Sequence, residues 1–579
     1  MQNPPGTNGR SWLITARPRM ARPDAAACPT HRRAVMHPLL EAVPALPYRP
    51  AMKEEFGFGP LFTALDLWEF EEWSLEEIRE ELRGTRGKFR GAGAPVHPVL
   101  LAWTAAALVY YTGARTEEQR AAVAAGLPET APVRQEWHVR SRRADLPDPR
   151  GARQYEQTVW GRSYQSADGT VRDLWLPSMG RAKKRRHTAE LAAVAQVVAL
   201  GAPEHRRPWG QEPPETSTAE SYPGPRPQLI RVFDVGCADG SVELLLSEGP
   251  EAVDSRYRQD AAPAFQEAVT GQGVQPGESC VDCKALAGCN SLKQSPGLWG
   301  GSPPVPARKR RSVSAWDLRL YGECPAQYHL VRKLHLNDLS QEGAGARRGR
   351  VVDNRLNEQH SLRPLRGCWD LDIPGVAELT SGDGLDETSA REAAAMLASH
   401  RFLCPLDGLG PGEQVLVQPQ ITAYVPELDV VVLAKPDLVY THRGRWMWRE
   451  TKTASKPLWE RESLLRTYPQ LALGVLLMHA SVVGGNPRRS WVQLEHLRED
   501  HRDSRLELID PSRAEIVEEA REVIADLATP LLQDTVYEPT PGRHCHGCQA
   551  RTWCRRGTAY VAGDQRPGVG APEQGAPCD

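Results

Sequence analysis

A cysteine motif that occurs twice constrains this chain more than any other feature. PGESCVDCKALAGC (276–289) and PGRHCHGCQARTWC (541–554) both read Pro-Gly, two residues, then C-x2-C-x5-C. Three thiols at this spacing are typical of a bound metal centre rather than of core packing. The flanks also agree, because residues 241–269 and 505–532 each predict a strand, a turn and an amphipathic helix. The repeat therefore predicts two related halves.

The chain length and its Pro-rich segments suggest where the two halves divide. At 579 residues the chain is too long for one hydrophobic core, so we expect at least two domains. The expected segments are a poorly ordered N-terminus (1–50), an N-terminal domain (51–292), a linker (293–311), a C-terminal domain (312–560) and a tail (561–579). Helical spacing over residues 61–127 predicts a helix-rich α+β N-terminal domain.

The composition is that of a soluble globular protein, with 40% hydrophobic and 25% charged residues. Since the net charge is −2, nucleic-acid binding must rest on local basic patches, for which residues 181–187, 307–312 and 346–350 are candidates. No apolar run approaches the ~20 residues of a membrane span, and the first residues lack a signal peptide's apolar core. We therefore expect a cytoplasmic protein without a membrane partner, in which clustered cysteines bind metal rather than form disulfides.

A carboxylate–lysine pattern lies in KPDLVYTHRGRWMWRETKTASK (435–456). The apolar run ending in PDLVY, the turn THRG and the alternating RWMWRETKT predict a two-stranded hairpin. Asp437 is expected in the first strand. Glu450 and Lys452 share one face of the second, because side chains two residues apart point the same way. Two carboxylates suit Mg²⁺ or Mn²⁺, and a lysine beside the metal could orient or deprotonate an attacking water. A solvated strand pair with a surface ion pair is the alternative.

Together with other motifs in order, this pattern resembles the PD-(D/E)xK nuclease superfamily, and in particular its RecB-like branch. SVSAWDLRLYGECPAQYHL (312–330) resembles the opening of that branch, NEQHSLRPL (357–365) its helix with a metal-binding histidine, and RTYPQLALGVLLMHA (466–480) its DNA-contacting helix. The resemblance implies a mixed α/β fold, with a restriction-endonuclease-like central mixed sheet flanked by helices in the C-terminal half. By the same resemblance, the metal ligands would be His360, Asp437, Glu450 and Thr451, with Lys452 also catalytic and Tyr468 and Gln470 contacting DNA. The family often has an aromatic residue where this chain has Gly474.

The iron–sulfur exonucleases of this superfamily, which include AddB-like and CRISPR-associated exonucleases, suggest a role for the second cysteine motif. They take their first cysteine from an upstream Cys-Pro, which here is Cys324, beside Cys545, Cys548 and Cys554. The resemblance thus implies a 4Fe-4S cluster. A zinc ion with His544 or His546 as fourth ligand is the alternative.

The first motif predicts a second metal centre at Cys280, Cys283 and Cys289, with either Cys237 or Cys28 as the fourth ligand. Cys28, like Cys324, precedes a proline, whereas Cys237 follows a predicted strand. No E-x-K pattern occurs on a predicted strand of the first half, so that half is expected to be catalytically silent.

These features favour a metal-dependent DNA nuclease, expected to be an exonuclease that acts on ends or single strands. A helicase or a defence-system protein is a candidate partner. A non-catalytic DNA-binding module stabilised by zinc or a cluster is the alternative. Trp446 and Trp448 beside the proposed site could stack on bases, although alternate strand residues are more often core.

Overall fold

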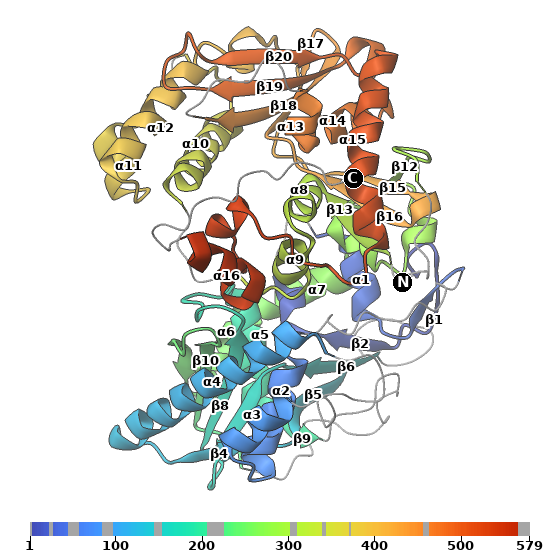
Figure 1. Ribbon diagram of the computed structural model, residues 1–579. Helices are drawn as coiled ribbons and strands as arrows, with labels where there is room; N and C mark the ends of the chain where they lie inside the picture. The colour runs from blue at the N-terminus through green and yellow to red at the C-terminus, as the bar shows by residue number, and fades with distance from the viewer. Residues whose placement is uncertain are drawn as a thin grey trace, which may run out of the picture.

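The computed structural model describes residues 3–22, 27–44, 57–83, 96–143, 153–204, 225–301, 310–337, 343–369, 372–454 and 463–564. The expected linker (293–311) lies partly outside the described residues, as do the tail (561–579) and the basic run at 307–312. The fold is mixed α/β, as expected, and its first and second halves lie at opposite ends of the molecule (Figure 1).

The second half is built on a five-stranded mixed sheet in the order β14-β17-β18-β19-β20. Its strands are β14 (Val415–Val417), β17 (Leu438–His442), β18 (Arg445–Thr453), β19 (Trp491–Leu497) and β20 (Arg505–Ile509). Only the β18–β19 pair is parallel. The helices of this half are α8 (Ala315–Glu323), α9 (Pro325–Tyr328), α10 (Ala344–Ser361), α11 (Val376–Ser381), α12 (Glu387–His400), α13 (Leu464–Thr467), α14 (Pro469–His479), α15 (Ala514–Gln533) and α16 (Arg555–Asp564).

The first half repeats this sheet strand for strand, in the order β4-β7-β8-β10-β11. Here too only the middle pair, β8–β10, is parallel. The strands are β4 (Thr130–Pro132), β7 (Arg162–Ser166), β8 (Val171–Ser178), β10 (Leu229–Gly236) and β11 (Val242–Glu248). The helices are α1 (Pro29–Met36), α2 (Gly59–Phe70), α3 (Leu75–Arg83), α4 (Pro98–Ala124), α5 (Thr188–Leu200), α6 (Pro250–Arg256) and α7 (Ala262–Thr270). The matching order and sense of the strands agree with the duplication that the cysteine motifs predict.

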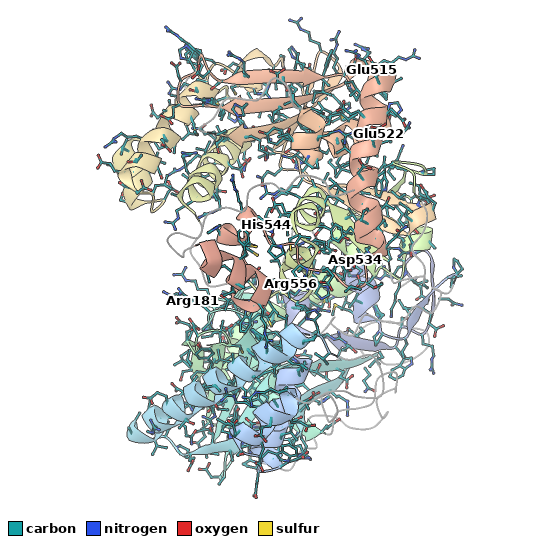
Figure 2. All side chains as sticks on the ribbon, in the orientation of Figure 1. Arg181, Glu515, Glu522, Asp534, His544 and Arg556 are labelled. Atoms are coloured by element: carbon teal, nitrogen blue, oxygen red, sulfur yellow. The ribbon has the colours of Figure 1, made fainter. Side chains whose placement is uncertain are left out.

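The connection between the two parallel strands contains an apolar helix in each half, α5 in the first and α14 in the second. Both helices are hydrophobic around most of their circumference, which is typical of a helix buried on all sides. In α14 every residue from Leu471 to Met478 is buried. By contrast, α15 carries an apolar stripe that faces the core, and its outer face bears the exposed Glu515 and Glu522 (Figure 2).

The described residues also form two four-stranded sheets, the first of which connects the halves. One contains β12 (Lys293–Gln294), β15 (Ile421–Val425), β16 (Val430–Ala434) and β13 (Arg311–Ser314), and another β2 (Leu13–Ala16), β6 (Arg153–Thr158), β5 (Glu136–Arg143) and β9 (Ala202–Glu204). The pair β12–β15 joins the two halves. Cys280 and Leu292 pack with Val431 of β16. The 3-10 turn Arg551–Trp553 of the second motif in turn packs on α4. Each cysteine motif therefore contacts the opposite half.

Two sequence expectations differ from this structure. The segment expected to be poorly ordered forms β1 (Thr7–Gly9), β2, α1 and β3 (Leu40–Ala42) within its described residues. The apolar run VVVLA (430–434) does not continue into the expected hairpin, because it forms β16 in a separate sheet. Asp437 lies just before β17 rather than within a strand. None of the described helices combines the length and apolar character that a membrane crossing needs.

Candidate active site and cysteine clusters

The hairpin β17–β18 brings Asp437, Glu450 and Lys452 together at one end of the sheet, as the sequence predicts. Leu438 pairs with Arg449, which places Asp437 opposite Glu450. The backbone N–H of Thr451 donates to Asp437 Oδ2 at 2.6 Å, and Lys452 Nζ lies 3.8 Å from Glu450 Oε2. Register and backbone geometry therefore fix the position of both carboxylates.

Asp437 and Glu450 both have raised pKa values. Burial and repulsion from Asp437 raise the pKa of Glu450 to about 8, although the nearby Lys452 opposes this shift. Burial also raises the pKa of Asp437 to about 6, again against the attraction of Lys452. Buried carboxylates that repel one another need a cation, and perturbed pairs of this kind cluster at functional sites. The donor set therefore fits a hard divalent cation such as Mg²⁺ or Mn²⁺.

A third carboxylate, Asp353, was missed in the sequence. It lies on α10, and its repulsion contributes to the raised pKa values of both Asp437 and Glu450. Gln418 links it to the hairpin, since the Gln418 side chain donates to Asp353 Oδ2 at 3.0 Å and the Gln418 backbone N–H donates to Asp437 O at 3.1 Å. Its position two helical turns before His360, on the same helical face, is the signal that could have found it.

His360, which was expected to bind the same cation, has other neighbours. Its Nε2 lies 3.2 Å from His400 Nε2 and 3.4 Å from Cys368 Sγ. Among the described residues no hydrogen bond or ion pair joins His360 to Asp437 or Glu450. His360 lies away from these carboxylates because the pitch of α10 carries it two turns beyond Asp353, which is the α10 residue that faces them.

Trp448 is a core residue that supports Glu450 from within the protein. Its side chain is 1% exposed, and its indole Nε1 donates to Glu450 Oε1 at 3.1 Å. It also fills the space beside Gly474 of α14, where a Cβ would lie 3.0 Å from the indole ring. An aromatic ring from β18 thus occupies the space at Gly474, where the resemblance implied an aromatic residue of the helix itself. Base stacking by Trp448 is excluded by its burial, and Trp446 packs against the loop at Gly485.

The residues expected to contact DNA lie at the start of α14. Tyr468 is its N-cap residue and Gln470 is in its first turn, and both are half-buried. The expected basic patches are partly engaged within the protein. Arg186 pairs with Asp234 and Arg181 with Asp239, although Arg181 remains exposed (Figure 2).

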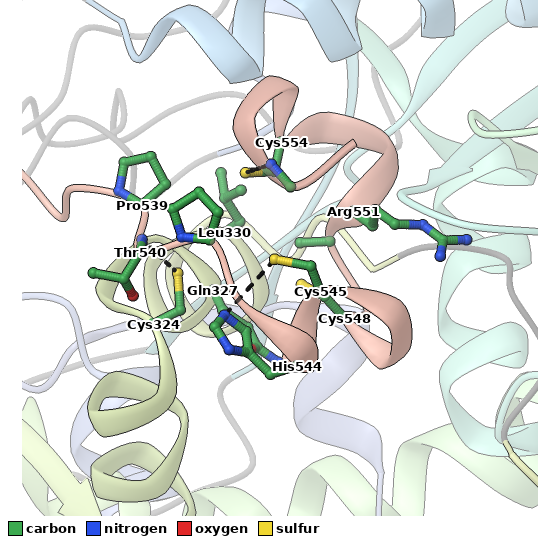
Figure 3. Close-up of a pocket in the computed structure, with 13 residues that line it drawn as sticks. Cys324, Gln327, Leu330, Pro539, Thr540, His544, Cys545, Cys548, Arg551 and Cys554 are labelled. Atoms are coloured by element: carbon green, nitrogen blue, oxygen red, sulfur yellow. Dashed lines mark hydrogen bonds between the residues drawn. The ribbon is translucent and has the colours of Figure 1, made fainter. Parts of the chain in front are cut away.

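In the second cysteine motif, the distant Cys324 and the three motif cysteines line one pocket (Figure 3). Backbone N–H groups point at the sulfurs, from Thr540 to Cys324 Sγ (3.5 Å), Gly542 to Cys545 Sγ (3.5 Å) and Gly557 to Cys554 Sγ (3.4 Å). Burial and repulsion from the other three thiols raise the pKa of Cys548 to about 11. His544, the fourth ligand of the zinc alternative, also lines this pocket, and its Nε2 lies 3.8 Å from Cys545 Sγ.

The first motif forms an equivalent pocket, and Cys28 rather than Cys237 completes it. Cys28, Cys280, Cys283 and Cys289 line a cavity of about 200 Å³. Gln275 N–H points at Cys28 Sγ (3.5 Å) and Gly277 N–H at Cys280 Sγ (3.4 Å), which repeats the contacts of the second motif. Cys237 is fully buried at the end of β10, beside Asp234.

The first half lacks the catalytic set at the equivalent positions. Arg162 at the start of β7 pairs with Trp175, as Leu438 pairs with Arg449. By this register Gly161, Leu176 and Ser178 occupy the places of Asp437, Glu450 and Lys452. Ser178 Oγ donates to Asp234 Oδ1 at 2.7 Å, and Arg186 pairs with the same carboxylate. An internal ion pair therefore fills this end of the first sheet.

Comparison with known proteins finds a family match in the second half. Residues 312–555 match the family described as the PD-(D/E)XK nuclease superfamily. Among solved structures, the chain is similar to a crystal structure from Eubacterium rectale described as a candidate exonuclease. The identity is 11%, the TM-score 0.27, and the match covers 41% of this chain and 86% of that one. No curated protein matches the chain significantly. The family match spans the expected domain and includes both the carboxylate site and the second cysteine motif.

Proposed function

We propose that the chain is a Mg²⁺- or Mn²⁺-dependent deoxyribonuclease of the RecB-like, iron–sulfur type. The observation that carries this proposal is the convergence of Asp353, Asp437 and Glu450 beside Lys452, with mutual repulsion that raises the carboxylate pKa values. A bound divalent cation would supply Lewis-acid stabilisation of the charge that develops on the phosphate.

The protein's own groups have separate roles in this proposal. Glu450 and Asp437 would bind the cation. The Trp448 indole holds Glu450 in place, and the Thr451 N–H holds Asp437. Asp353 and a backbone oxygen of Thr451 are further ligand candidates. Lys452 would orient the attacking water or, in its neutral form, accept the proton of that water. Tyr468 and Gln470 contact the DNA backbone at the N-terminus of α14, where helix N–H groups favour phosphate.

The cysteine clusters are proposed to be structural 4Fe-4S centres. Cys324 and Cys545 are more than 200 residues apart in sequence. A cluster between them joins the two ends of the nuclease domain, and closing so long a loop should stabilise the fold. The first half is proposed to be a catalytically silent partner that holds DNA or another protein against the second half.

The exonuclease part of the proposal is tested by comparing linear and covalently closed circular DNA. The full chain, purified without oxygen, should degrade end-labelled linear DNA with Mn²⁺ and leave closed circles intact. Single-stranded and duplex linear substrates, labelled at either end, would give strand preference and polarity. Cleavage of closed circles at the rate of linear DNA would show an endonuclease, and no cleavage of any substrate would contradict the proposed function.

A further inference from the structure

Four metal-binding side chains converge beside the active-site sheet, apart from both cysteine motifs. They are His360 in the last turn of α10, Cys368 in the following loop, His400 at the end of α12, and Cys404 four residues later. Their ligand atoms all lie within 4.8 Å of one another, and they form the only such group among the described residues. His360, Cys368 and His400 are at most 5% exposed.

The distances within this group match one tetrahedral zinc ion. With Zn–N bonds of about 2.0–2.1 Å and Zn–S bonds of about 2.3 Å, tetrahedral geometry separates two nitrogens by ~3.3 Å and a nitrogen from a sulfur by ~3.6 Å. The two imidazole Nε2 atoms are 3.2 Å apart. His360 Nε2 lies 3.4 Å from Cys368 Sγ and 3.8 Å from Cys404 Sγ. One ion would satisfy both facing nitrogens and both thiolates at once.

A carboxylate orients one of the histidines in the way that zinc sites require. His400 Nδ1 lies 2.6 Å from Oε1 of Glu495, a fully buried residue of β19. Such a partner fixes the imidazole tautomer and leaves Nε2 for the metal. The other oxygen, Glu495 Oε2, lies 3.3 Å from Arg449 Nη1 and 3.3 Å from Thr451 Oγ1. The group is thereby connected to β18, next to Glu450 and Lys452.

We propose that His360, Cys368, His400 and Cys404 bind one structural Zn²⁺ that fastens α10 and α12 to the active-site sheet. With four protein ligands, three of them buried, the ion has no open position, as in structural rather than catalytic zinc sites. Because Asp353 precedes His360 by two turns of α10, the ion also sets where that carboxylate faces Asp437 and Glu450. The site does not depend on the proposed nuclease activity.

The first test is metal analysis of the full chain, purified without oxygen. Elemental analysis should give about one zinc per chain in addition to iron. The double variant Cys368→Ser/Cys404→Ser should lose the zinc and keep the iron. As a control, Cys237→Ala, at a buried thiol outside all three groups, should keep both metals. Zinc-free wild-type protein with full iron, or zinc retained in the double variant, would overturn the proposal.

A second measurement needs no variant and decides the question if the double variant does not fold. Zinc X-ray absorption of the wild-type protein should show two sulfur ligands at ~2.3 Å and two nitrogen ligands at ~2.0 Å. A four-sulfur shell would assign the zinc to a cysteine motif instead and would refute this site.

Mass spectrometry of the alkylated, unreduced protein should find Cys368 and Cys404 as thiols. A disulfide between them would equally contradict zinc binding.

Discussion

At the residue scale, the site depends on how each carboxylate is held. Trp448 was an ambiguous residue in the sequence, because a tryptophan beside an active site could stack on a base or belong to the core. Its burial and its 3.1 Å hydrogen bond to Glu450 assign it to the support of the carboxylate.

Replacing Trp448 by Phe should therefore change the pH dependence of the activity. The indole hydrogen bond lowers the pKa of Glu450, against the larger effect of burial. Hydrogen bonds to charged groups contribute about 1.5–3 kcal/mol, and one pKa unit corresponds to about 1.4 kcal/mol. Glu450 must be ionised to bind the metal. Loss of the indole hydrogen bond should therefore move the acidic limb of the pH–rate profile upward by about one to two units. Rates at fixed Mn²⁺ between pH 5.5 and 9.5 would measure this shift.

Trp446→Phe is the matched control, because Trp446 packs against the loop at Gly485. Its pH profile should remain that of the wild type. If both variants, or neither, displaced the acidic limb, the support role of Trp448 would be wrong.

The residues of the two candidate sites show the limits of sequence reasoning at this scale. Asp437, Glu450 and Lys452 were predictable, because strand alternation and hairpin pairing are local rules. Asp353 and Glu495 were not, because their positions depend on how α10 and β19 pack against that hairpin. Cys368 and Cys404 belong to neither C-x2-C-x5-C motif, so no local pattern marked them as metal ligands.

At the element scale, α14 must lie very close to β18. Gly474 allows this approach. In the sequence, this glycine only indicated that an aromatic residue common in the family is absent. The sequence predicted the helix and the hairpin separately, but not that Trp448 would occupy the space that Gly474 leaves.

Gly474→Ala tests this packing. The added Cβ would meet the Trp448 ring at 3.0 Å and push it away from Glu450. Overpacking of this kind costs about 1–3 kcal/mol in the free energy of unfolding, which denaturant unfolding followed by tryptophan fluorescence would measure. Nuclease activity should fall at the same time. A Gly113→Ala control in α4, where the added Cβ meets no atom within 4 Å, should not destabilise the protein. A stable and fully active Gly474→Ala protein would show that α14 can move away without affecting the site.

At the scale of the whole molecule, two halves of equal sheet topology pack together, and each cysteine motif contacts the opposite half. The duplication was predictable from the motif spacing, whereas the strand-for-strand match and the contact of each motif with the opposite half were not. These contacts depend on long-range packing, which no local pattern encodes. The largest core cluster includes Trp103 of the first half and Trp448 of the second, so the halves share one core.

The equivalence of the two motifs predicts two clusters and therefore about eight iron atoms per chain, with matching acid-labile sulfide. Cys28→Ser and Cys324→Ser should each remove about half of the iron, because each residue completes a different pocket. Cys237→Ala should remove none. Iron analysis of protein purified without oxygen would measure this. An iron content that depends on Cys237 and not on Cys28, or zinc in both motifs without iron, would contradict the assignment.

Cleavage of end-labelled linear DNA by matched lysine and carboxylate variants tests the central claim most directly. Glu450→Gln and Lys452→Ala should each lower the Mn²⁺-dependent rate by ~10²–10³-fold or more, since each removes a group that stabilises the transition state. Lys435→Ala, at an exposed lysine two residues before Asp437, should cleave at the wild-type rate. Circular dichroism and iron content should be unchanged in all three. Cleavage within a few-fold of wild type in both Glu450→Gln and Lys452→Ala would contradict the assignment of the active site.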